Sequence, residues 1–355
     1  MEKLYSIQYL RALAALLVVV AHAFSHQIGV DNALVVLAGR LGVVLFFVIS
    51  GFIMVYISGS GAFSPATFLK RRIIRIVPLY WLFTGLTALI AVAAPSLLQT
   101  TVFTWPHFLQ SLLFIVHEAP GRGGTSPILS LGWTLNYEAY FYLAFAALAF
   151  MAATSRILLL TALFTATWLL GLVLAPQDPV LQFYLNASPL AFAAGAWIGW
   201  ARLNGQNLLD PRKAVLLGAI SMIGLALALR DDGSILSANL GFAGQVLWAT
   251  GMVMIGLFLE PHLKRISLAE QLGDSSYALY LSHMFAIGAV TQVAKRTIGT
   301  GNNLTLIATT IACIITACLV AILVHSLVEK PLLRLFAGKH PANRPSRTNS
   351  VPAAG

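Results

Sequence analysis

Long apolar runs, each close to 20 residues and nearly free of charge, recur along the whole chain. A helix that crosses a bilayer needs about 20 consecutive apolar residues, so each run predicts a transmembrane helix. Ten such helices are expected, at 10–28, 35–58, 74–95, 133–152, 157–174, 183–201, 214–230, 239–259, 276–296 and 305–328. A shorter apolar piece, 106–116, predicts an interfacial or re-entrant helix. The pattern therefore predicts an all-α polytopic membrane protein.

The composition indicates a membrane protein rather than a soluble one. Of 355 residues, 58% are hydrophobic and only 10% are charged, whereas soluble globular chains carry about 25% charged residues. Residues 1–336 are expected to form one membrane domain. The segment 337–355 is rich in Pro, Asn, Ser and Arg and has no apolar periodicity, so it is expected to be a disordered cytoplasmic tail.

The chain has a net charge of +10, and the distribution of its basic residues between the two sides of the membrane explains their number. With the N-terminus in the cytoplasm, sixteen Lys and Arg residues fall in cytoplasmic segments. Five fall in external segments: Arg40, Arg122, Arg230, Lys295 and Arg296. Basic residues concentrate on the cytoplasmic side of membrane proteins. The asymmetry predicts ten spans with both termini cytoplasmic, and no nucleic-acid partner is needed to explain the charge.

Several kinds of site are absent from the sequence. There is no Walker loop, dinucleotide fingerprint or H-E-x-x-H motif, and no metal site is expected. Cys313 and Cys318 are five residues apart in the last predicted span, so they point to different helix faces and are not expected to bridge. At the N-terminus, Lys3, an apolar run and Ala21-His22-Ala23 imitate a signal peptide. Arg11 interrupts this pattern, so a retained first span is expected.

Two ionisable residues lie in the first predicted span, where each costs roughly 2.5–3.5 kcal/mol on insertion scales and is a candidate for function. Arg11 and His22 are eleven residues apart, which places them on one stripe of a helix, about 16 Å apart along its axis. A neutral imidazole suits general-base work near pH 7, and a guanidinium suits phosphate binding. A snorkelling arginine and a packing histidine are the alternative interpretations.

Four cations, Lys70, Arg71, Arg72 and Arg75, stand at the cytoplasmic end of the third predicted span. Arg72 and Arg75 share a helix face at i,i+3, so they are candidates for binding a polyanionic donor. Orientation of the span by positive charge is the preferred explanation for Lys70 and Arg71. For Arg72 and Arg75 the two explanations have equal weight.

Other polar residues lie in the second, fourth and ninth predicted spans. Glu138 lies about 7 Å inside the fourth span, at a depth that matches His22, so the two are expected to converge on one acceptor. A structural pair with an arginine is the alternative. Ser50-Gly51 permits close backbone approach, which helix packing explains equally well. Tyr280 and His283 belong to an aromatic stripe, a pattern that is more often packing than a site.

Five short motifs occur in a fixed order along the chain. They are Tyr5–Ala12 with His22 eleven residues after Arg11, Gly42–Phe52, Arg71–Tyr80, Gly132–Glu138 and Ser276–His283, and Glu329-Lys330-Pro331 closes the series. Together they resemble the acyltransferase-3 family of integral membrane acyltransferases, and within it the bacterial exopolysaccharide O-acetyltransferases of the succinoglycan type. Each motif alone is weak, but the ordered set covers about 1–335.

The resemblance implies a multi-pass enzyme of the bacterial inner membrane. It would be an O-acyltransferase that moves an acetyl or other acyl group from cytoplasmic acyl-CoA to a hydroxyl of an exopolysaccharide or other cell-surface glycan. Acetyl-CoA would be a donor co-substrate rather than a permanently bound cofactor. The implied partners are acyl-CoA, membrane lipid and a glycan or lipid-linked saccharide acceptor.

The resemblance also implies roles for individual residues. Arg11, Arg72 and Arg75 would bind the donor. His22 would activate the sugar hydroxyl, with Glu138 in support. Further candidate substrate contacts are Ser50, Trp133, Asn136, Tyr280 and His283. Direct transfer and an acyl-histidine intermediate both remain open.

One position departs from the family's pattern and bears on the alternatives. Many members carry an acid after the Gly-Val of the second span, where this chain has Val44. A non-catalytic partner of a polysaccharide synthesis complex gains weight from this change. A multispan transporter of a glycan intermediate or organic acid is a further alternative. Transporters typically show paired broken helices or repeat symmetry, and the sequence shows neither.

Overall fold

The computed structural model describes residues 3–28, 32–98, 101–121, 123–206, 211–229, 234–297 and 302–337. Within these ranges every regular element is a helix, which confirms the predicted all-α fold. The elements are α1 (Tyr5–Ile28), α2 (Ala33–Ser58), α3 (Pro65–Ala93), η1 (Pro95–Leu97), α4 (Trp105–Leu112), η2 (Ser130–Gly132), α5 (Trp133–Ala147), α6 (Ala153–Leu174), α7 (Pro179–Tyr184), α8 (Pro189–Leu203), α9 (Pro211–Ala228), α10 (Ile235–Leu259), η3 (Glu260–His262), α11 (Ser267–Asp274), α12 (Ser276–Thr297), α13 (Asn303–Val324), the π-helical η4 (His325–Glu329) and α14 (Lys330–Ala337). The predicted tail, beyond Ala337, lies outside the described residues.

Each of the ten predicted spans contains a helix, but these helices are not equally suited to a bilayer. Six described segments are long and apolar enough to cross one: Tyr5–Gln27, Ala33–Ser58, Pro65–Ala93, Ala153–Leu174, Ile235–His262 and Asn303–Phe336. By contrast, α5 and α8 have 15 residues each, fewer than a crossing usually needs. The protein is therefore a multi-pass helical membrane protein, and the number of ten spans stays a prediction.

Local start signals move some helix boundaries away from the predicted ones. α3 begins at Pro65, because Ser64 caps its first turn and the proline occupies an initial position. The four-cation cluster consequently lies inside this helix rather than before it. The sixth predicted span is divided into α7 and α8, because Asn186 accepts hydrogen bonds from Ser188 and Pro189 begins α8. The short apolar piece 106–116 contains the helix α4, which ends at Leu112, and its interfacial or re-entrant position stays a prediction.

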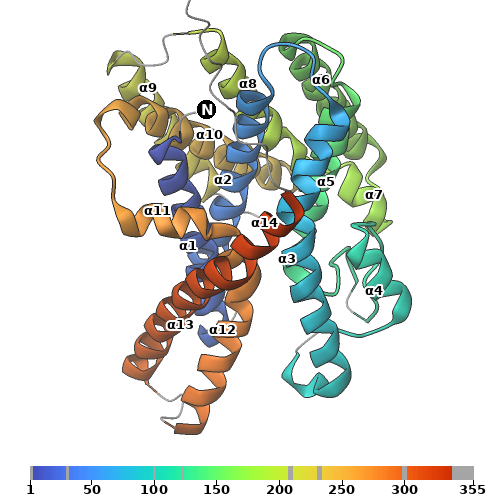
Figure 1. Ribbon diagram of the computed structural model, residues 1–355, viewed down its shortest axis with the longest axis vertical. Coiled ribbons are helices and arrows are strands. Elements are labelled where there is room, and N and C mark those ends of the chain that lie inside the picture. Colours follow the sequence, from blue (N-terminus) through green and yellow to red (C-terminus); the bar gives the residue numbers. More distant parts are fainter. Residues whose placement is uncertain are drawn as a thin grey trace, which may run out of the picture.

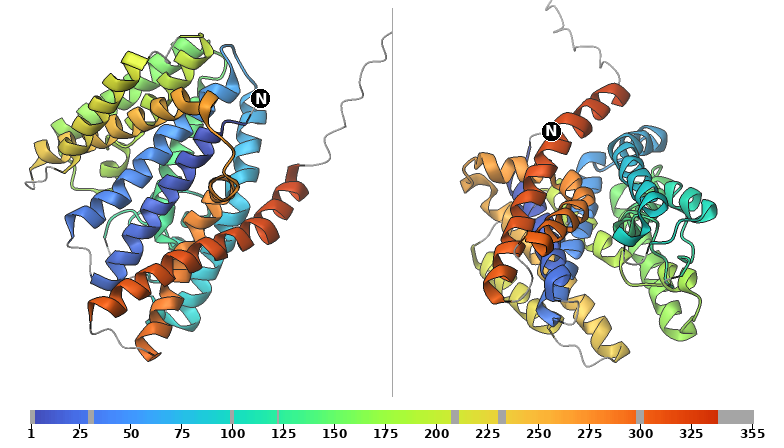
Figure 2. Two further views of the ribbon diagram at one scale, coloured as in Figure 1. Left: turned by 90° about the vertical axis from the view of Figure 1, so that its left-hand side faces the viewer. Right: turned by 90° about the horizontal axis from the view of Figure 1, so that it is seen from below.

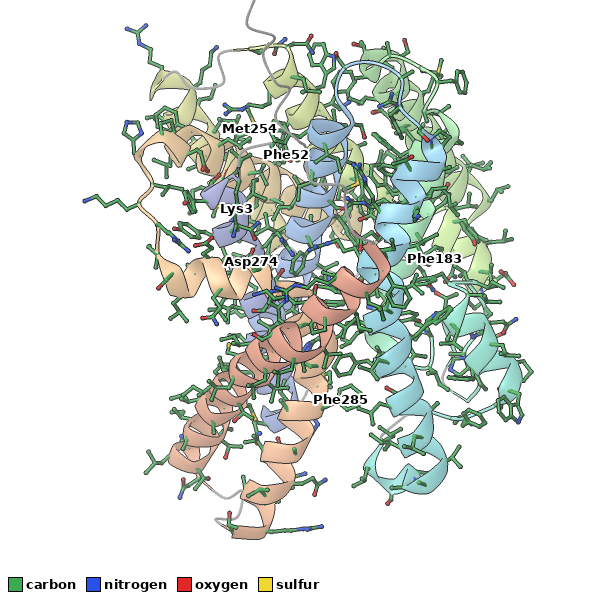
Figure 3. All side chains as sticks on the ribbon, viewed as in Figure 1. Lys3, Phe52, Phe183, Met254, Asp274 and Phe285 are labelled. Atoms are coloured by element: carbon green, nitrogen blue, oxygen red, sulfur yellow. The ribbon has the colours of Figure 1, made fainter. Side chains whose placement is uncertain are left out.

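Two glycines bring α2 and α8 into close contact along the middle of the bundle. A Cβ atom at Gly51 would overlap the carbonyl group of Phe192, and one at Gly195 would overlap that of Val48. Small residues at such crossings let helix backbones approach closely in membranes. Packing thus accounts for the glycine of Ser50-Gly51. The neighbouring Phe52 side chain, labelled in Figure 3, is fully buried.

The last part of the chain crosses the face of the bundle. α12 and α13 pack against each other and against α1, at the lower left of Figure 1. Figure 2 shows α13, η4 and α14 as one continuous tilted rod. The π-helical turn ends two residues before Pro331, whose ring cannot fit an undisturbed helix interior. The rod ends at α14, which contacts α3, so it links the two sides of the molecule.

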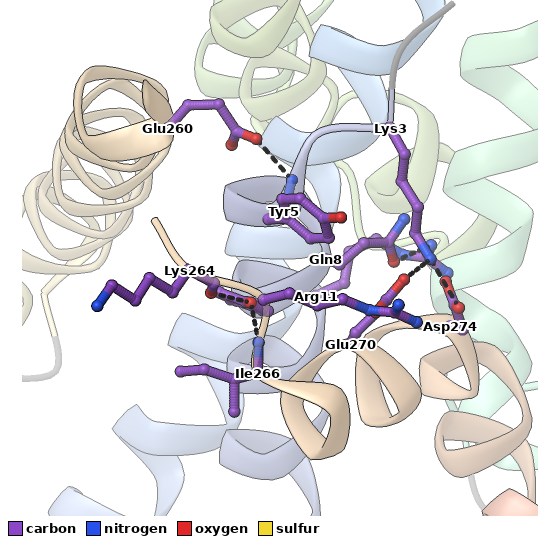
Figure 4. A network of polar contacts seen from close by, with 11 residues as sticks. Lys3, Tyr5, Gln8, Arg11, Glu260, Lys264, Ile266, Glu270 and Asp274 are labelled. Atoms are coloured by element: carbon purple, nitrogen blue, oxygen red, sulfur yellow. Dashed lines mark hydrogen bonds and ion pairs between the residues drawn. The ribbon is translucent and has the colours of Figure 1, made fainter. Parts of the chain in front are cut away.

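A polar network holds the start of α1 against the segment that carries η3 and α11 (Figure 4). The Lys3 ammonium lies 2.6 Å from Glu270 and 2.9 Å from Asp274, and Lys3 and Asp274 are neighbours in Figure 3. The Glu260 carboxylate accepts a hydrogen bond of 2.8 Å from the Tyr5 amide, where a negative charge also stabilises the helix N-terminus. The N-terminus and the connection between α10 and α12 therefore lie at the same end of the bundle.

Arg156 has a structural role that its charge alone does not indicate. Its guanidinium is buried and donates to the carbonyl groups of Gly61, Met151 and Leu148 at 2.9, 2.6 and 3.2 Å. It also lies 4.5 Å from the Phe63 ring. The sequence indicated a cation that orients the protein in the membrane. The structure shows that it also joins the α2–α3 loop to the α5–α6 turn.

The connection between α3 and α5 contains a buried histidine pair. His107 Nδ1 and His117 Nε2 are 2.6 Å apart, and His117 Nδ1 lies 2.7 Å from the Ile115 carbonyl oxygen. Burial and the neighbouring His117 lower the pKa of His107 to about 4. Neither ring lines either of the two pockets of the candidate site.

Candidate active site

Three arginines from two helices line one pocket, here called the arginine pocket. Arg11 comes from α1, and Arg72 and Arg75 come from α3. The structure thus brings together the three residues predicted to bind the donor. The cavity measures about 320 Å³. Its other polar lining residues are Ser50, Thr134, Glu138, Tyr142, Ser276, Tyr277 and Tyr280.

The arginines of this pocket have few partners of their own. In the part of the chain that the structure describes, none of the three forms an ion pair with a carboxylate. Arg11 donates to Gln8 at 3.2 Å, and both are drawn in Figure 4. Arg72 Nε is buried without a hydrogen-bond partner, and the guanidinium lies 6.0 Å from the Phe68 ring. Because like charges repel, a bound anion stabilises such a cluster.

Glu138 lies in the arginine pocket and not beside His22. Its Oε1 atom accepts hydrogen bonds from the Ser50 hydroxyl, at 3.2 Å, and from the Tyr142 hydroxyl. The expected convergence of Glu138 and His22 on one acceptor does not hold, because the two residues line different pockets. The prediction compared only the depths of His22 and Glu138 in the membrane. Depth does not tell which face of its helix each side chain occupies. The catalytic role of Glu138 stays a prediction, and it would apply at the arginine pocket.

A second pocket contains His22 and is here called the histidine pocket. It measures about 850 Å³. The arginine pocket takes in Met54 and Ile57 near the end of α2, whereas this one takes in Val35 and Val36 near its start. The two pockets therefore extend toward opposite ends of α2. Polar side chains that line the histidine pocket are Ser25, Arg40, Thr125, Ser126, Ser130, Gln182, Asn186, Ser188 and Gln245.

His22 is held by a second histidine from α12. His22 Nδ1 and His283 Nε2 are 3.0 Å apart, and the rings stack at 5.0 Å between centroids. His283 Nδ1 lies 3.0 Å from the Leu279 carbonyl oxygen. A carbonyl oxygen only accepts, so His283 Nδ1 carries the proton, and in a neutral ring its Nε2 is then an acceptor. His22 Nδ1 must therefore donate, which leaves His22 Nε2 unprotonated.

This arrangement defines what His22 can do. In this tautomer Nε2 is the unprotonated nitrogen of His22, and the residue lines the histidine pocket. An unprotonated imidazole nitrogen at a polar pocket accepts a proton from a bound hydroxyl group. His283, predicted as a substrate contact, is completely buried and contacts His22 instead. It sets the tautomer and orientation of the catalytic candidate.

A thin wall of side chains separates the two pockets. Val43, Phe47 and Tyr280 line both of them. The Tyr280 hydroxyl lies 2.7 Å from Thr134 Oγ1 and 3.0 Å from the Leu131 carbonyl oxygen, which fixes the ring in place. A group bound in one pocket is therefore separated from a group in the other by single side chains rather than by whole helices.

The other residues predicted for the site lie partly in these pockets and partly outside them. Trp133 lines the histidine pocket, and Tyr280 lies in the wall. Asn136 lines neither pocket and is buried in α5, where its Oδ1 atom has no hydrogen-bond partner. His325, an ionisable residue at the end of the last predicted span, lies 2.7 Å from Glu329 in the π-helical turn. This buried pair also lines neither pocket.

Several site residues were not predicted. Gln182 precedes the end of α7, Asn186 follows it, and Gln245 lies in α10. Neutral amides carry no charge penalty that would mark them within an apolar sequence, so a pattern of ionisable residues does not reveal them. Gln245 is buried within a 25-residue apolar helix, and that contrast was the only signal available for it.

Comparison with known proteins identifies the family to which this chain is similar. A family model described as an acyltransferase domain matches residues 4–325. "Exopolysaccharide production protein ExoZ" of Rhizobium meliloti (strain 1021) is 38% identical over 300 residues, which cover 83% of this chain and 90% of that protein. "Acyltransferase MdmB" of Streptomyces mycarofaciens is 24% identical over 385 residues, covering 96% of this chain and 94% of that protein. No solved structure matches the chain.

Proposed function

Because this chain belongs to the acyltransferase-3 family of membrane acyltransferases, we propose that it transfers an acetyl group from cytoplasmic acetyl-CoA to a hydroxyl of an exopolysaccharide or other cell-surface glycan. One observation carries the proposal. An arginine pocket and a histidine pocket extend toward opposite ends of α2 and meet at a wall of three side chains. A donor and an acceptor on opposite sides of the membrane then meet near the middle of the protein.

The donor fits the arginine pocket by charge. Coenzyme A carries several phosphate groups at its adenosine end, and guanidinium groups bind phosphate through paired hydrogen bonds. Arg11, Arg72 and Arg75 are available for these bonds because none of them forms an ion pair with a carboxylate within the described structure. The neutral pantetheine arm then leads the thioester toward the wall. Arg11 and His22 are about 16 Å apart along α1.

The transfer step uses His22 as a general base. Its Nε2 atom takes the proton of the sugar hydroxyl as the oxygen attacks the thioester carbonyl carbon. The new C–O bond forms the ester and the C–S bond breaks, and the leaving coenzyme A thiolate takes the proton from His22 Nε2, which restores the base. His283 keeps Nδ1 of His22 protonated throughout, because it accepts that hydrogen bond.

The proposal is tested with detergent-purified protein, labelled acetyl-CoA and a glycan acceptor. The expected result is label on the sugar that is released by mild alkali, as an O-ester would be. Absence of transfer, with intact folded protein and a competent acceptor, would refute it. A transporter would instead move the glycan across proteoliposomes, and a non-catalytic partner would restore transfer only when added to a synthesis complex.

We also propose ten spans with both termini in the cytoplasm. The sixteen-to-five distribution of basic residues supports this, as does the position of the N-terminus beside the connection that carries Lys264 and Arg265. Reporter fusions at Gly123 are expected to be active only outside, and fusions at the C-terminus only inside. A C-terminal reporter that is active outside would contradict the topology.

Loss of one arginine from the arginine pocket is expected to weaken the binding of acetyl-CoA and to leave kcat nearly unchanged. A hydrogen bond to a charged group contributes roughly 1.5–3 kcal/mol, so Arg72→Gln and Arg75→Gln should each raise the KM for acetyl-CoA about 10- to 100-fold. Arg72→Lys should recover only part of this loss, because lysine lacks the planar fork of arginine. Steady-state kinetics with varied acetyl-CoA measure the effect.

The matched control for that experiment is Arg71→Gln. Arg71 is next to Arg72 in the sequence but is exposed and does not line the arginine pocket. Arg71→Gln removes the same charge from the same helix as the two test variants. The KM of this variant for acetyl-CoA should stay near that of the unchanged protein. If all three glutamine variants behave alike, the basic residues orient the helix in the membrane and do not bind the donor.

A further inference from the structure

The histidine pocket has the surface that a sugar requires. Trp133, Tyr137 and Phe183 line it with aromatic rings, and flat aromatic faces pack well against the C–H faces of sugar rings. Gln182, Asn186 and Gln245 also line it. Side-chain amides both donate and accept hydrogen bonds, as sugar hydroxyls do. This lining agrees with the saccharide acceptor of the proposed function, on which the following inference rests.

The described lining of the histidine pocket carries a positive charge and no negative one. Arg40 is the only permanently charged residue in its described lining, and no Asp or Glu is present there. Arg40 lies seven residues after the start of α2, about 10 Å along the helix. In the described structure it forms no ion pair with a carboxylate. A cation on an apolar membrane helix is costly unless it faces water or an anion.

The residue one turn further along α2 strengthens the argument. Val44 is at i+4 from Arg40, where a carboxylate would form an ion pair on the same helix face. Val44 itself lines the pocket and is buried. With valine at that position, nothing within the helix neutralises the guanidinium. Arg40 is also exposed, so its guanidinium is available to a ligand.

We propose that the histidine pocket selects an anionic saccharide, and that Arg40 binds an oxyanion of the acceptor. The oxyanion is either a carboxylate on a sugar ring or the diphosphate of a lipid-linked saccharide, since a guanidinium binds both in the same bidentate way. Arg40 then positions the acceptor and sets its specificity, while His22 acts on the hydroxyl. Neutral saccharides of the same length bind more weakly because they leave the arginine without an anion.

The experiment measures binding of two matched pairs of saccharides to the detergent-purified full chain by titration calorimetry. In the first pair, a uronate-containing oligosaccharide is compared with its carboxyl-reduced form. In the second, a neutral oligosaccharide diphosphate is compared with the same oligosaccharide without phosphate. The expected result is at least about tenfold tighter binding of the anionic member of one pair, consistent with one charge-assisted hydrogen bond. The pair that shows the preference identifies the source of the anion.

Variants at the same position test whether Arg40 is responsible. Arg40→Gln is expected to bring the affinity ratio close to 1, and Arg40→Glu to reverse it. Arg296→Gln is the control, because Arg296 is exposed at the end of α12 and lines neither pocket. Equal affinity within both pairs for the unchanged protein, or an equal loss of preference in Arg40→Gln and Arg296→Gln, would overturn the proposal. Because Arg40 is exposed, its replacement should leave the fold intact, and thermal unfolding checks this.

Binding and transfer are read separately, so the two proposals fail in different ways. A clear anionic preference without any label on the acceptor would contradict the acyl transfer and leave the binding site standing. Label on neutral and anionic acceptors with equal efficiency and equal affinity would contradict the role of Arg40 and leave the acyl transfer standing.

Discussion

Replacement of His22 by glutamine is expected to lower kcat by about 10²–10⁴-fold, the usual contribution of a general base. Glutamine keeps much of the size of histidine and can still donate a hydrogen bond to His283. It has no nitrogen that accepts a proton near neutral pH. His22→Ala should be impaired to a similar degree, while the KM for acetyl-CoA changes little in both variants, because the donor arginines are untouched. Initial rates at saturating donor and acceptor measure the effect.

His26→Gln is the matched control for this experiment. His26 lies one turn further along α1, is half-buried and does not line the histidine pocket. Its replacement should leave kcat within a few-fold of the unchanged protein. A structural role for His22 predicts the opposite pattern, in which glutamine is tolerated and alanine folds poorly. Near-normal turnover by a well-folded His22→Gln protein would therefore remove the base from the mechanism.

Replacement of His283 by leucine is expected to lower kcat on the order of 10²-fold, although His283 does not line either pocket. Leucine fills the buried space but removes the acceptor of the 3.0 Å contact with His22 Nδ1. The His22 ring is then free to adopt the other tautomer, and loss of tautomer control at a catalytic histidine costs as much as about 10⁴-fold in the serine proteases. The KM for acetyl-CoA should be unaffected.

The conservative variant separates positioning from packing. His283→Gln retains an oxygen that can accept the Nδ1 proton of His22, so it should recover a substantial part of the lost kcat. The pH dependence of kcat should also change in the leucine variant, because its catalytic imidazole no longer has a partner. Equal activity of the leucine and glutamine variants, with equal thermal stability, would show that His283 only fills space.

Much of the helical framework could be predicted from apolar run length. Each predicted span contains a helix, because a run of apolar residues has few other stable arrangements in a bilayer. Whether every one of these helices crosses the bilayer stays a prediction for two helices that carry site residues. α5 holds Thr134, Glu138 and Tyr142, and α12 holds Tyr280 and His283. Neither helix is among the six segments most suited to cross a bilayer, since polar and short helices depend on their neighbours for burial.

The candidate site was only partly predictable for a related reason. Arg72 and Arg75 were paired correctly because residues at i,i+3 share a helix face. The contact between His22 and His283 joins positions 261 apart in the chain, and no local rule links them. Glu138 was assigned to the wrong pocket because helix rotation, which decides the direction of a side chain, depends on packing against other helices. The sequence therefore identified most reactive groups but not their grouping.

The wall formed by Val43, Phe47 and Tyr280 has an electrical consequence. If the pockets open to opposite sides of the membrane as proposed, both fill with water and ions, and most of the transmembrane voltage falls across this thin layer. Moving one elementary charge through the full voltage involves about 2.3 kcal/mol per 100 mV. An acetyl group is uncharged and crosses without electrical work, but a proton or an ion does not. The wall must therefore act as an insulator that admits an acyl carbonyl, and bulky apolar side chains with one anchored tyrosine are suited to that task.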